Sequence, residues 1–285
     1  MRRSALPPGS ERLRGLFVSK SPTHSICEQF GGDLVQISFP NENDVTEAEK
    51  MRVETPFLRQ LARLGWTSPK EGLRKNFSNV LLLDRLRDAL RRINLTDDGK
   101  EWLDDDRIGQ AISELRSLPG SSVMRANQKA FQLLQEGTAV DAWPEKTGYE
   151  GEPTVNYIDF EHPQRNDFLA INQFRVDRPG SQRSKYPDIV LFVNGIPLVV
   201  VECKASTAGA DPIDEALGQL FGYEGRRDDK EGIPRLFHYN QVMVATCFED
   251  AVAGPVGAPE QHFLEWKDVW PSTEDDLKER LDRDY

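Results

Sequence analysis

The sequence predicts an α/β protein in which a mixed central sheet is flanked by helices and preceded by a helical region. Three observations lead to this fold class. Apolar residues recur at helical spacing through residues 54–136, β-branched runs fill residues 154–203, and a helical segment followed by another apolar run comes after them. A crossover helix between two strands is typical of a sheet that mixes parallel and antiparallel pairs.

Three segments of the helical region carry their apolar residues on one helix face. The first follows Met51, and Pro119-Gly120 is placed to end the third. The apolar positions are Phe57, Leu58, Leu61 and Leu64 in the first segment, Leu82, Leu86, Leu90 and Ile93 in the second, and Ile108, Ile112 and Leu115 in the third.

The chain then changes to strand patterns. We expect strands over residues 154–160, 167–175 and 241–246, and a helix over residues 212–223. The leader, which is rich in Pro, Ser and Gly, offers one strand near residues 34–39. The sequence thus divides into a variable N-terminal extension (1–50), a helical region that includes the first core helix (51–150), an α/β core (151–270) and an acidic C-terminal segment (271–285).

The most informative segment spans residues 186–206. Two apolar, mostly β-branched runs flank Asn194-Gly195, a dipeptide strongly favoured in two-residue hairpin turns. Asp188 stands at the outer start of the first strand, and Glu202 and Lys204 stand at the outer end of the second. A hairpin folded at this turn brings the three polar side chains to one end of the sheet.

The register of this hairpin decides whether the three side chains share a face. With a strict two-residue loop and no bulge, paired residue numbers sum to 389, so Asp188 would lie opposite Val201 and point away from Glu202. We therefore expect an odd-length loop, or a β-bulge that makes the sum even. Pro197 cannot donate a ladder hydrogen bond, so it marks a position where the pairing can be offset.

Two carboxylates at one end of an apolar sheet need a physical reason. At about 4 Å they repel by roughly 4 kcal/mol at an effective dielectric near 20. A divalent cation held by Asp188 and Glu202 removes this repulsion, and Mg²⁺ suits such a small set of oxygen ligands, with the Cys203 carbonyl as a third. Lys204 would then orient water or neutralise charge on a phosphate. The pattern predicts metal-assisted phosphodiester hydrolysis.

The same residues also allow a purely structural interpretation. An E-x-K triplet and a P-D dipeptide both occur by chance in charged proteins. Their joint position favours catalysis, because polar groups that interrupt buried strands need a partner or a function.

A family resemblance rests on two motifs. Pro187-Asp188, thirteen further residues and then Glu202-Cys203-Lys204 resemble the PD-(D/E)xK nuclease superfamily, and Gln219 with Tyr223 is similar to the Q-x-x-x-Y motif of its RecB-like branch. Residues 150–270 are similar to the N-terminal nuclease domain of type I restriction enzyme R subunits, with a weaker similarity over residues 54–66. The resemblance implies a restriction-endonuclease-like core that cleaves DNA.

The resemblance also assigns roles outside the hairpin. It implies that Glu54 supplies an acidic residue from the upstream helix, although the helix dipole alone also favours a glutamate in a first turn. Gln219 and Tyr223 lie one turn apart on one helix face. The resemblance has them contact DNA or steer Lys204; the alternative is a surface glutamine and a tyrosine at the rim of the core.

The implied partners are double-stranded DNA and the methyltransferase and specificity subunits of a type I complex. The resembled R subunits carry an ATP-driven motor after the nuclease, but this sequence has no G-x-x-x-x-G-K-[ST] motif, so residues 271–285 would lead towards a motor that the chain lacks. We expect Mg²⁺ here, ATP only in a full-length R subunit and S-adenosylmethionine only in the holoenzyme. The alternatives are a free-standing PD-(D/E)xK nuclease of repair or defence and a non-catalytic DNA-binding or assembly module.

The composition of the chain bears on its binding partner and its cellular location. The net charge is −11, but Lys and Arg outnumber Asp and Glu ten to four over residues 52–92, whereas residues 241–285 carry four against eleven. Further basic clusters lie within residues 178–185 and 226–230. This asymmetry is typical of a protein with a DNA-facing side. Three cysteines without C-x-x-C spacing, no apolar signal segment and no apolar run near twenty residues predict a reduced, cytoplasmic protein outside the membrane.

Overall fold

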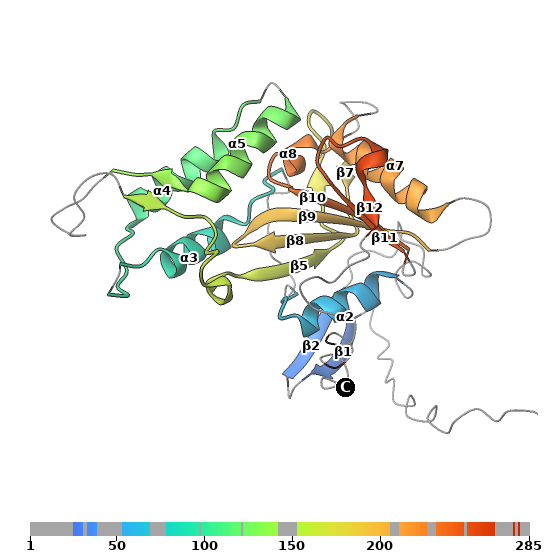
Figure 1. The fold of residues 1–285 in the computed structure, drawn as a ribbon, viewed down its shortest axis with the longest axis horizontal. Helices are drawn as coiled ribbons and strands as arrows, with labels where there is room; N and C mark the ends of the chain where they lie inside the picture. Colours follow the sequence, from blue (N-terminus) through green and yellow to red (C-terminus); the bar gives the residue numbers. More distant parts are fainter. Residues whose placement is uncertain are drawn as a thin grey trace, which may run out of the picture.

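A six-stranded sheet forms the centre of the protein in the computed structural model, in the order β12-β11-β10-β9-β8-β5 (Figure 1). The structure describes residues 25–30, 33–38, 53–68, 78–96, 98–120, 122–141, 153–205, 211–226, 232–247 and 250–265, with residues 276 and 279. The strands of the sheet are β5 (Phe168–Asn172), β8 (Ile189–Val193), β9 (Ile196–Cys203), β10 (Val242–Thr246), β11 (Ala251–Pro255) and β12 (Leu264–Glu265).

The sheet is mixed, as predicted. β5, β8 and β9 pair antiparallel, β9 and β10 pair parallel, and β10, β11 and β12 pair antiparallel again. Between the two parallel strands the chain forms α7 (Pro212–Glu224) and α8 (Pro234–Phe237), the kind of long crossover that a parallel pair requires. The α/β class is confirmed, and the architecture agrees with the restriction-endonuclease-like core that the resemblance implies.

Helices cover both faces of the sheet (Figure 1). On one face α2 (Thr55–Arg63) packs through Leu58 and Leu61 against a cluster that includes Ile189 and Val201. On the other face one hydrophobic core joins the sheet to α7, α8 and three further helices, α3 (Leu83–Ile93), α4 (Asp105–Arg116) and α5 (Val123–Glu136). The predicted helical region therefore packs directly on the sheet.

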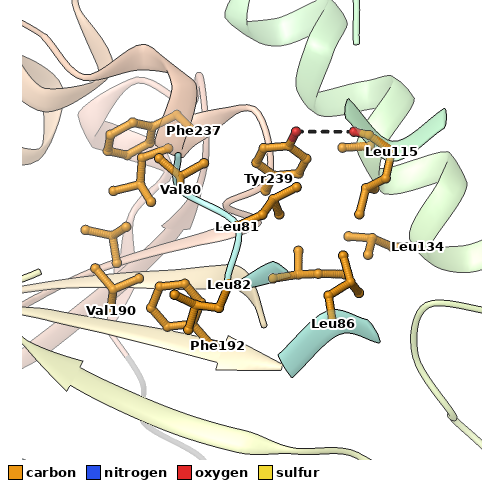
Figure 2. Close-up of a cluster of buried hydrophobic side chains, with 14 of the residues drawn as sticks. Val80, Leu81, Leu82, Leu86, Leu115, Leu134, Val190, Phe192, Phe237 and Tyr239 are labelled. Atoms are coloured by element: carbon orange, nitrogen blue, oxygen red, sulfur yellow. Dashed lines mark hydrogen bonds between the residues drawn. The ribbon is translucent and has the colours of Figure 1, made fainter. Parts of the chain in front are cut away.

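Figure 2 shows where the helical region meets the turn end of β8. Leu82 lies beside Phe192 there, with Leu86 further along towards Leu134, and the Tyr239 hydroxyl donates a hydrogen bond of 3.2 Å to the Leu115 carbonyl. Leu86 and Phe192 are fully buried, and burial of each such side chain contributes roughly 1.5–3 kcal/mol. This packing holds the β8–β9 turn against the start of α3.

Short elements complete the described fold. Two-stranded ribbons are formed by β1 (Ser25–Phe30) with β2 (Asp33–Ser38), β3 (Thr138–Ala139) with β4 (Thr154–Val155), and β6 (Val176–Asp177) with β7 (Ser184–Lys185). Two 3-10 turns span Pro163–Arg165 and Glu260–His262. The strand predicted near residues 34–39 is present as β2, and its partner β1 was not predicted. The rest of the N-terminal extension, and the acidic segment apart from residues 276 and 279, lie outside the described residues.

Two sequence predictions are wrong. The strand expected over residues 154–160 ends at Val155, because side-chain amides take the next backbone N–H groups: Asn156 donates to the Asn94 amide oxygen and Asp159 to that of Asn166. Leu64 does not join the buried face of the first helix. It is 76% exposed, since α2 ends one residue earlier and Leu64 is its C-cap.

Other boundaries move slightly. The strand predicted over residues 167–175 stops at Asn172, because Gln173 has φ +48 and leaves the strand conformation. The helix predicted over residues 212–223 is α7, the strand over 241–246 is β10, and the third helical segment ends at Arg116 before Pro119-Gly120. β11 was not predicted; its Gly254 and Pro255 are poor strand formers. No helix in the described part of the chain is long and apolar enough to span a membrane.

The turn at Gly195 leads to a stability prediction. Gly195 has φ +79, and a Cβ added there would lie 2.6 Å from the Leu82 carbonyl oxygen, whose residue also donates its N–H to the Gly195 carbonyl at 2.9 Å. We expect Gly195→Ala to lower the free energy of unfolding by about 2–4 kcal/mol, from backbone strain plus displacement of the start of α3. Urea denaturation measures the difference.

Gly180→Ala is the matched control. Gly180 also has a positive φ, +66, but a Cβ there would meet nothing within 4 Å. This variant should lose only about 1 kcal/mol, the cost of the left-handed backbone conformation. Equal losses in the two variants would show that contact between the turn and α3 contributes little.

Candidate active site at the end of β8 and β9

The hairpin contains the bulge that its polar residues require. The turn Asn194-Gly195 has two residues, both with positive φ (+53 and +79), as a type I′ turn demands. Beside the turn the paired numbers sum to 389, but from Leu191↔Val199 outward they sum to 390, which leaves Leu198 as an extra residue on β9. The predicted even register is confirmed. It arises from a bulge directly after Pro197 and not from a longer loop.

The new register brings the predicted site residues together. The outermost pair of the β8–β9 ladder is Ile189↔Val201. Continuing the same register by one residue puts Asp188 opposite Glu202. The Cys203 N–H donates to Asp188 Oδ2 at 2.7 Å. Lys204 Nζ donates to Glu202 Oε1 at 3.0 Å and to the Cys203 carbonyl at 3.3 Å. Asp188, Glu202, Lys204 and the Cys203 carbonyl thus form one contiguous cluster.

This cluster is charged but almost fully buried. Asp188 is 6% exposed, Glu202 0% and Lys204 7%. Burial raises the pKa of Asp188, against the opposing effects of the Cys203 hydrogen bond and the Lys204 charge. Burial, together with the charge of Asp188, raises the pKa of Glu202 well above its ordinary value, and Lys204 opposes this shift. Acids held out of solvent in this way are typical of functional sites.

A glutamine that the sequence analysis did not assign connects this cluster to Glu54. Gln173 Nε2 donates to Asp188 Oδ1 at 3.1 Å and to Glu54 Oε1 at 3.4 Å, and Gln173 is itself buried. Glu54 immediately precedes α2 and is fully buried. The predicted upstream acid therefore lies beside the site, and not on an exposed first turn where the dipole alone would explain it.

Gln173 carries a signal in the sequence, but only part of its role is visible there. Asn172-Gln173 places two amides after the apolar residues of β5, and buried amides need partners. The left-handed backbone of Gln173 cannot be inferred from the sequence, because a glutamine rarely adopts φ +48. Its N–H also donates to the Asp188 carbonyl at 2.8 Å, so backbone and side chain both hold Asp188.

Gln219 and Tyr223 also reach the site from α7. Gln219 Nε2 lies 2.5 Å from the Tyr223 hydroxyl, and Tyr223 is buried whereas Gln219 is half-buried. Burial raises the pKa of Tyr223 well above its ordinary value, and the charge of Glu202 adds to the shift. Tyr223 also belongs to the main hydrophobic core. Tyr223 is therefore a core residue that also lies within range of the Glu202 charge, and Gln219 contacts the Tyr223 hydroxyl from one helical turn away.

Cys203 supplies backbone groups to the cluster, not a thiolate ligand. Cys203 and Cys247 are buried free thiols, and the side chain of Cys27 lies outside the described residues. Burial raises the pKa of the Cys203 thiol well above its ordinary value, and the charges of Asp188, Glu54 and Glu202 raise it further. Within the described ranges no three His, Cys, Asp or Glu side chains are grouped as a metal site. Any cation here would rely on Asp188, Glu202 and a backbone carbonyl.

Comparisons with known proteins all point to one family. Residues 46–262 match the family described as "Type I restriction enzyme R protein N terminus". The chain is 32% identical over 234 residues to the "Type I restriction enzyme HindI endonuclease subunit" of Haemophilus influenzae, covering 80% of this chain and 20% of that protein. It is 28% identical over 196 residues to the "Type I restriction enzyme SauMSSORF170P endonuclease subunit" of Staphylococcus aureus, covering 67% and 18%.

A third relative matches a shorter region. The chain is 33% identical over 104 residues to the "Type I restriction enzyme SsaAORF53P endonuclease subunit" of Staphylococcus saprophyticus, which covers 36% of this chain and 10% of that protein. The chain spans about a fifth of the length of the HindI relative.

The Gln173 contacts lead to a second stability prediction. Gln173→Glu replaces a donor shared by Asp188 and Glu54 with a third carboxylate between them. We expect the free energy of unfolding without divalent metal to fall by about 1–3 kcal/mol, since two charge-assisted hydrogen bonds are lost and repulsion is added. Chemical denaturation in a metal chelator measures it.

Gln128→Glu makes the same chemical change at an exposed position of α5 and should alter stability by no more than about 0.5 kcal/mol. If Gln173→Glu is as stable as Gln128→Glu, Gln173 does not hold the two acids.

Proposed function

This chain belongs to the family of type I restriction enzyme R protein N-terminal domains, and we propose that it is the metal-dependent DNA-cleaving domain of such a subunit, with a PD-(D/E)xK site. The observation that carries the proposal is the convergence of Asp188, Glu202 and Lys204 at the buried end of β8 and β9. Burying such a charged group costs free energy, so its presence at the end of an apolar sheet favours a functional role over a structural one.

The residues at this end of the sheet fit a divalent cation. Glu202 Oε2 is buried and has no hydrogen-bond partner in the described part of the chain, so an acceptor oxygen is left to be satisfied. Asp188 and Glu202 would hold Mg²⁺, with the Cys203 carbonyl as a third oxygen ligand. When bound, the metal would supply Lewis-acid activation of the scissile phosphate and lower the pKa of a water.

The side chains around the carboxylates would orient the reacting groups. The Cys203 N–H and Gln173 fix both oxygens of Asp188, so its carboxylate has little rotational freedom. Glu202 holds Lys204 Nζ at 3.0 Å. An ammonium fixed in this way would donate to a phosphate oxygen and offset the negative charge that develops during cleavage. Its burial strengthens the interaction, because screening by water is weak there.

Glu54, Gln219 and Tyr223 have supporting roles in this proposal. Glu54 would orient Gln173 and, through it, Asp188. Gln219 and Tyr223 would close the site on the α7 side, where Gln219 is exposed enough to meet the DNA backbone. The cluster thus takes residues from α2, the sheet and α7.

We propose the substrate, the partner subunits and the cofactors of the whole enzyme on the same premise. Double-stranded DNA is the substrate, and methyltransferase and specificity subunits are the partners, in the cytoplasm. ATP would act in the motor of a full-length R subunit, and S-adenosylmethionine in the assembled enzyme. These assignments belong to the whole enzyme, whereas this chain spans about a fifth of the length of the HindI endonuclease subunit alone.

Lys204→Ala tests the chemistry. In the assembled enzyme we expect DNA cleavage to fall by at least about 100-fold, because one fixed donor to the developing charge is removed. ATP-dependent translocation should remain intact, since the motor lies elsewhere. Conversion of closed circular plasmid to linear product measures cleavage. Lys129→Ala, a half-exposed lysine on α5, is the matched control and should cleave like wild type. Cleavage near the wild-type rate by Lys204→Ala would remove Lys204 from the site.

Asp188→Asn tests the metal. Asparagine keeps an oxygen for the Cys203 N–H but removes the charge that a cation needs. At 100 times the dissociation constant, bound metal should stabilise the wild-type chain by about 2.7 kcal/mol. We expect this gain to be lost in Asp188→Asn and kept in Asp84→Asn, whose carboxylate is fully exposed on α3. Denaturation with and without Mn²⁺ measures it; equal gains in all three proteins would contradict the assignment.

A further inference from the structure

The β6–β7 ribbon continues the β5–β8 pair beyond the sheet. Paired residue numbers sum to 361 along β5 and β8, from Phe168↔Val193 to Asn172↔Ile189, and again in Val176↔Lys185. The gap is bridged in the same register, since Gln173 N–H donates to the Asp188 carbonyl at 2.8 Å and Phe174 N–H to the Pro187 carbonyl at 3.1 Å. One long hairpin therefore runs from the sheet, past Asp188, to a tip at residues 178–183.

The part of this hairpin beyond Asp188 is basic. Residues 174–187 contain four Lys or Arg and one acid, in a chain whose net charge is −11. The acid, Asp177, is held within the ribbon, because it accepts from Ser184 Oγ at 2.8 Å and lies 3.4 Å from Arg175. Asp177 is therefore engaged by Ser184 and Arg175, and residues 174–187 keep three more basic than acidic residues.

Two of these residues face each other across the ribbon. The 361 register places Arg178 opposite Arg183, and the Arg178 N–H donates to the Arg183 carbonyl at 3.0 Å. Arg183 is exposed and Arg178 is half-buried. Phosphate accepts arginine hydrogen bonds well, so this basic tip suits a phosphate ligand.

The ribbon is also correctly placed relative to the candidate site. Asp188 lies five residue steps beyond Arg183, or about 17 Å along the strand. That length corresponds to about five base pairs of duplex at 3.4 Å each. A two-stranded ribbon also fits a DNA groove. Phosphates that contact the tip would therefore belong to the same duplex as a phosphate at Asp188.

We propose that the β6–β7 ribbon binds the phosphate backbone of duplex DNA through Arg178, Arg183 and Lys185 and thereby positions the duplex over the site. This inference rests on the proposed function, and it adds the surface and the kind of contact. The contact is electrostatic and independent of sequence, because arginines that neutralise phosphates release counterions without reading bases.

The test is duplex binding by the chain as a function of salt, in a metal chelator so that no cleavage occurs. Fluorescence anisotropy with a labelled 30-base-pair duplex measures the affinity. We expect Arg178→Ala combined with Arg183→Ala to weaken binding about tenfold near 0.1 M salt. The slope of log affinity against log salt should fall in magnitude by about 1.8, or about 0.9 for each lost phosphate contact.

Two further double variants make the result specific. Arg116→Ala with Arg125→Ala removes the same charge from exposed positions of α4 and α5, and should change affinity less than twofold. Arg178→Lys with Arg183→Lys keeps the charge and should keep the slope. Urea midpoints of all variants confirm that each is folded. Equal slopes for the ribbon variant and the Arg116/Arg125 variant, or no duplex binding by wild type at low salt, would overturn the proposal.

A cleavage assay distinguishes failure of the ribbon contact from failure of the proposed nuclease function. If wild-type enzyme cuts plasmid with Mg²⁺ but the ribbon variant binds DNA as well as wild type does, the ribbon contact is refuted and the nuclease assignment stands. A ribbon variant that binds DNA normally but no longer assembles with its partner subunits would identify the ribbon as a protein contact and also refute the proposal. Wild-type enzyme that binds duplex through the ribbon yet never cuts would support the contact and count against the nuclease.

Discussion

The candidate site depends on one extra residue in one strand. Without Leu198, β8 and β9 would keep the register set by the Asn194-Gly195 turn, and Asp188 would face away from Glu202. The bulge changes the face of every residue beyond it on β9. The Leu198 carbonyl accepts a hydrogen bond of 2.7 Å from the Gln241 N–H, so the irregular backbone is itself used where β10 begins. The bulge is thus an integral part of the sheet structure.

The rest of the hairpin holds this arrangement in place. Asn194 is fully buried, and its side chain accepts from the Asp167 N–H and donates to the Tyr157 carbonyl and the Asn166 side chain. The turn is therefore held from three directions, while Pro197 occupies the position just before the bulge. At the other end of the hairpin the buried charges are opposed by hydrogen bonds from Gln173 and the Cys203 N–H. Side-chain hydrogen bonds therefore order both ends of the hairpin, and apolar packing against α3 adds to them at the turn.

Much of this was predictable from the sequence, and the exceptions have identifiable physical causes. The hairpin, the helices and the even register follow from apolar periodicity and from the requirement that Asp188 and Glu202 share a face. The early end of the strand at Val155 does not, because it depends on Asn94, which is 62 residues from the Asn156 N–H that donates to it, and on a local turn that brings Asn166 to the Asp159 N–H. Gln173 was missed for a similar reason. Its role depends on a left-handed backbone and on two acids that only the folded chain brings to it.

The partners of the hydrogen bonds in the site are separated by very different lengths of chain. This difference predicts the order in which the site assembles during folding. Asp188 and Cys203 are 15 residues apart, as are Gln173 and Asp188, whereas Gln173 and Glu54 are 119 residues apart. Short loops close with a smaller loss of entropy than long ones, and local contacts form faster. A chain collapsing from the unfolded state would assemble the two-strand half of the cluster early, and Glu54 would join it only when α2 docks on the sheet. The acid contributed by α2 is therefore the last to arrive, so the cluster is complete only in the fully folded domain.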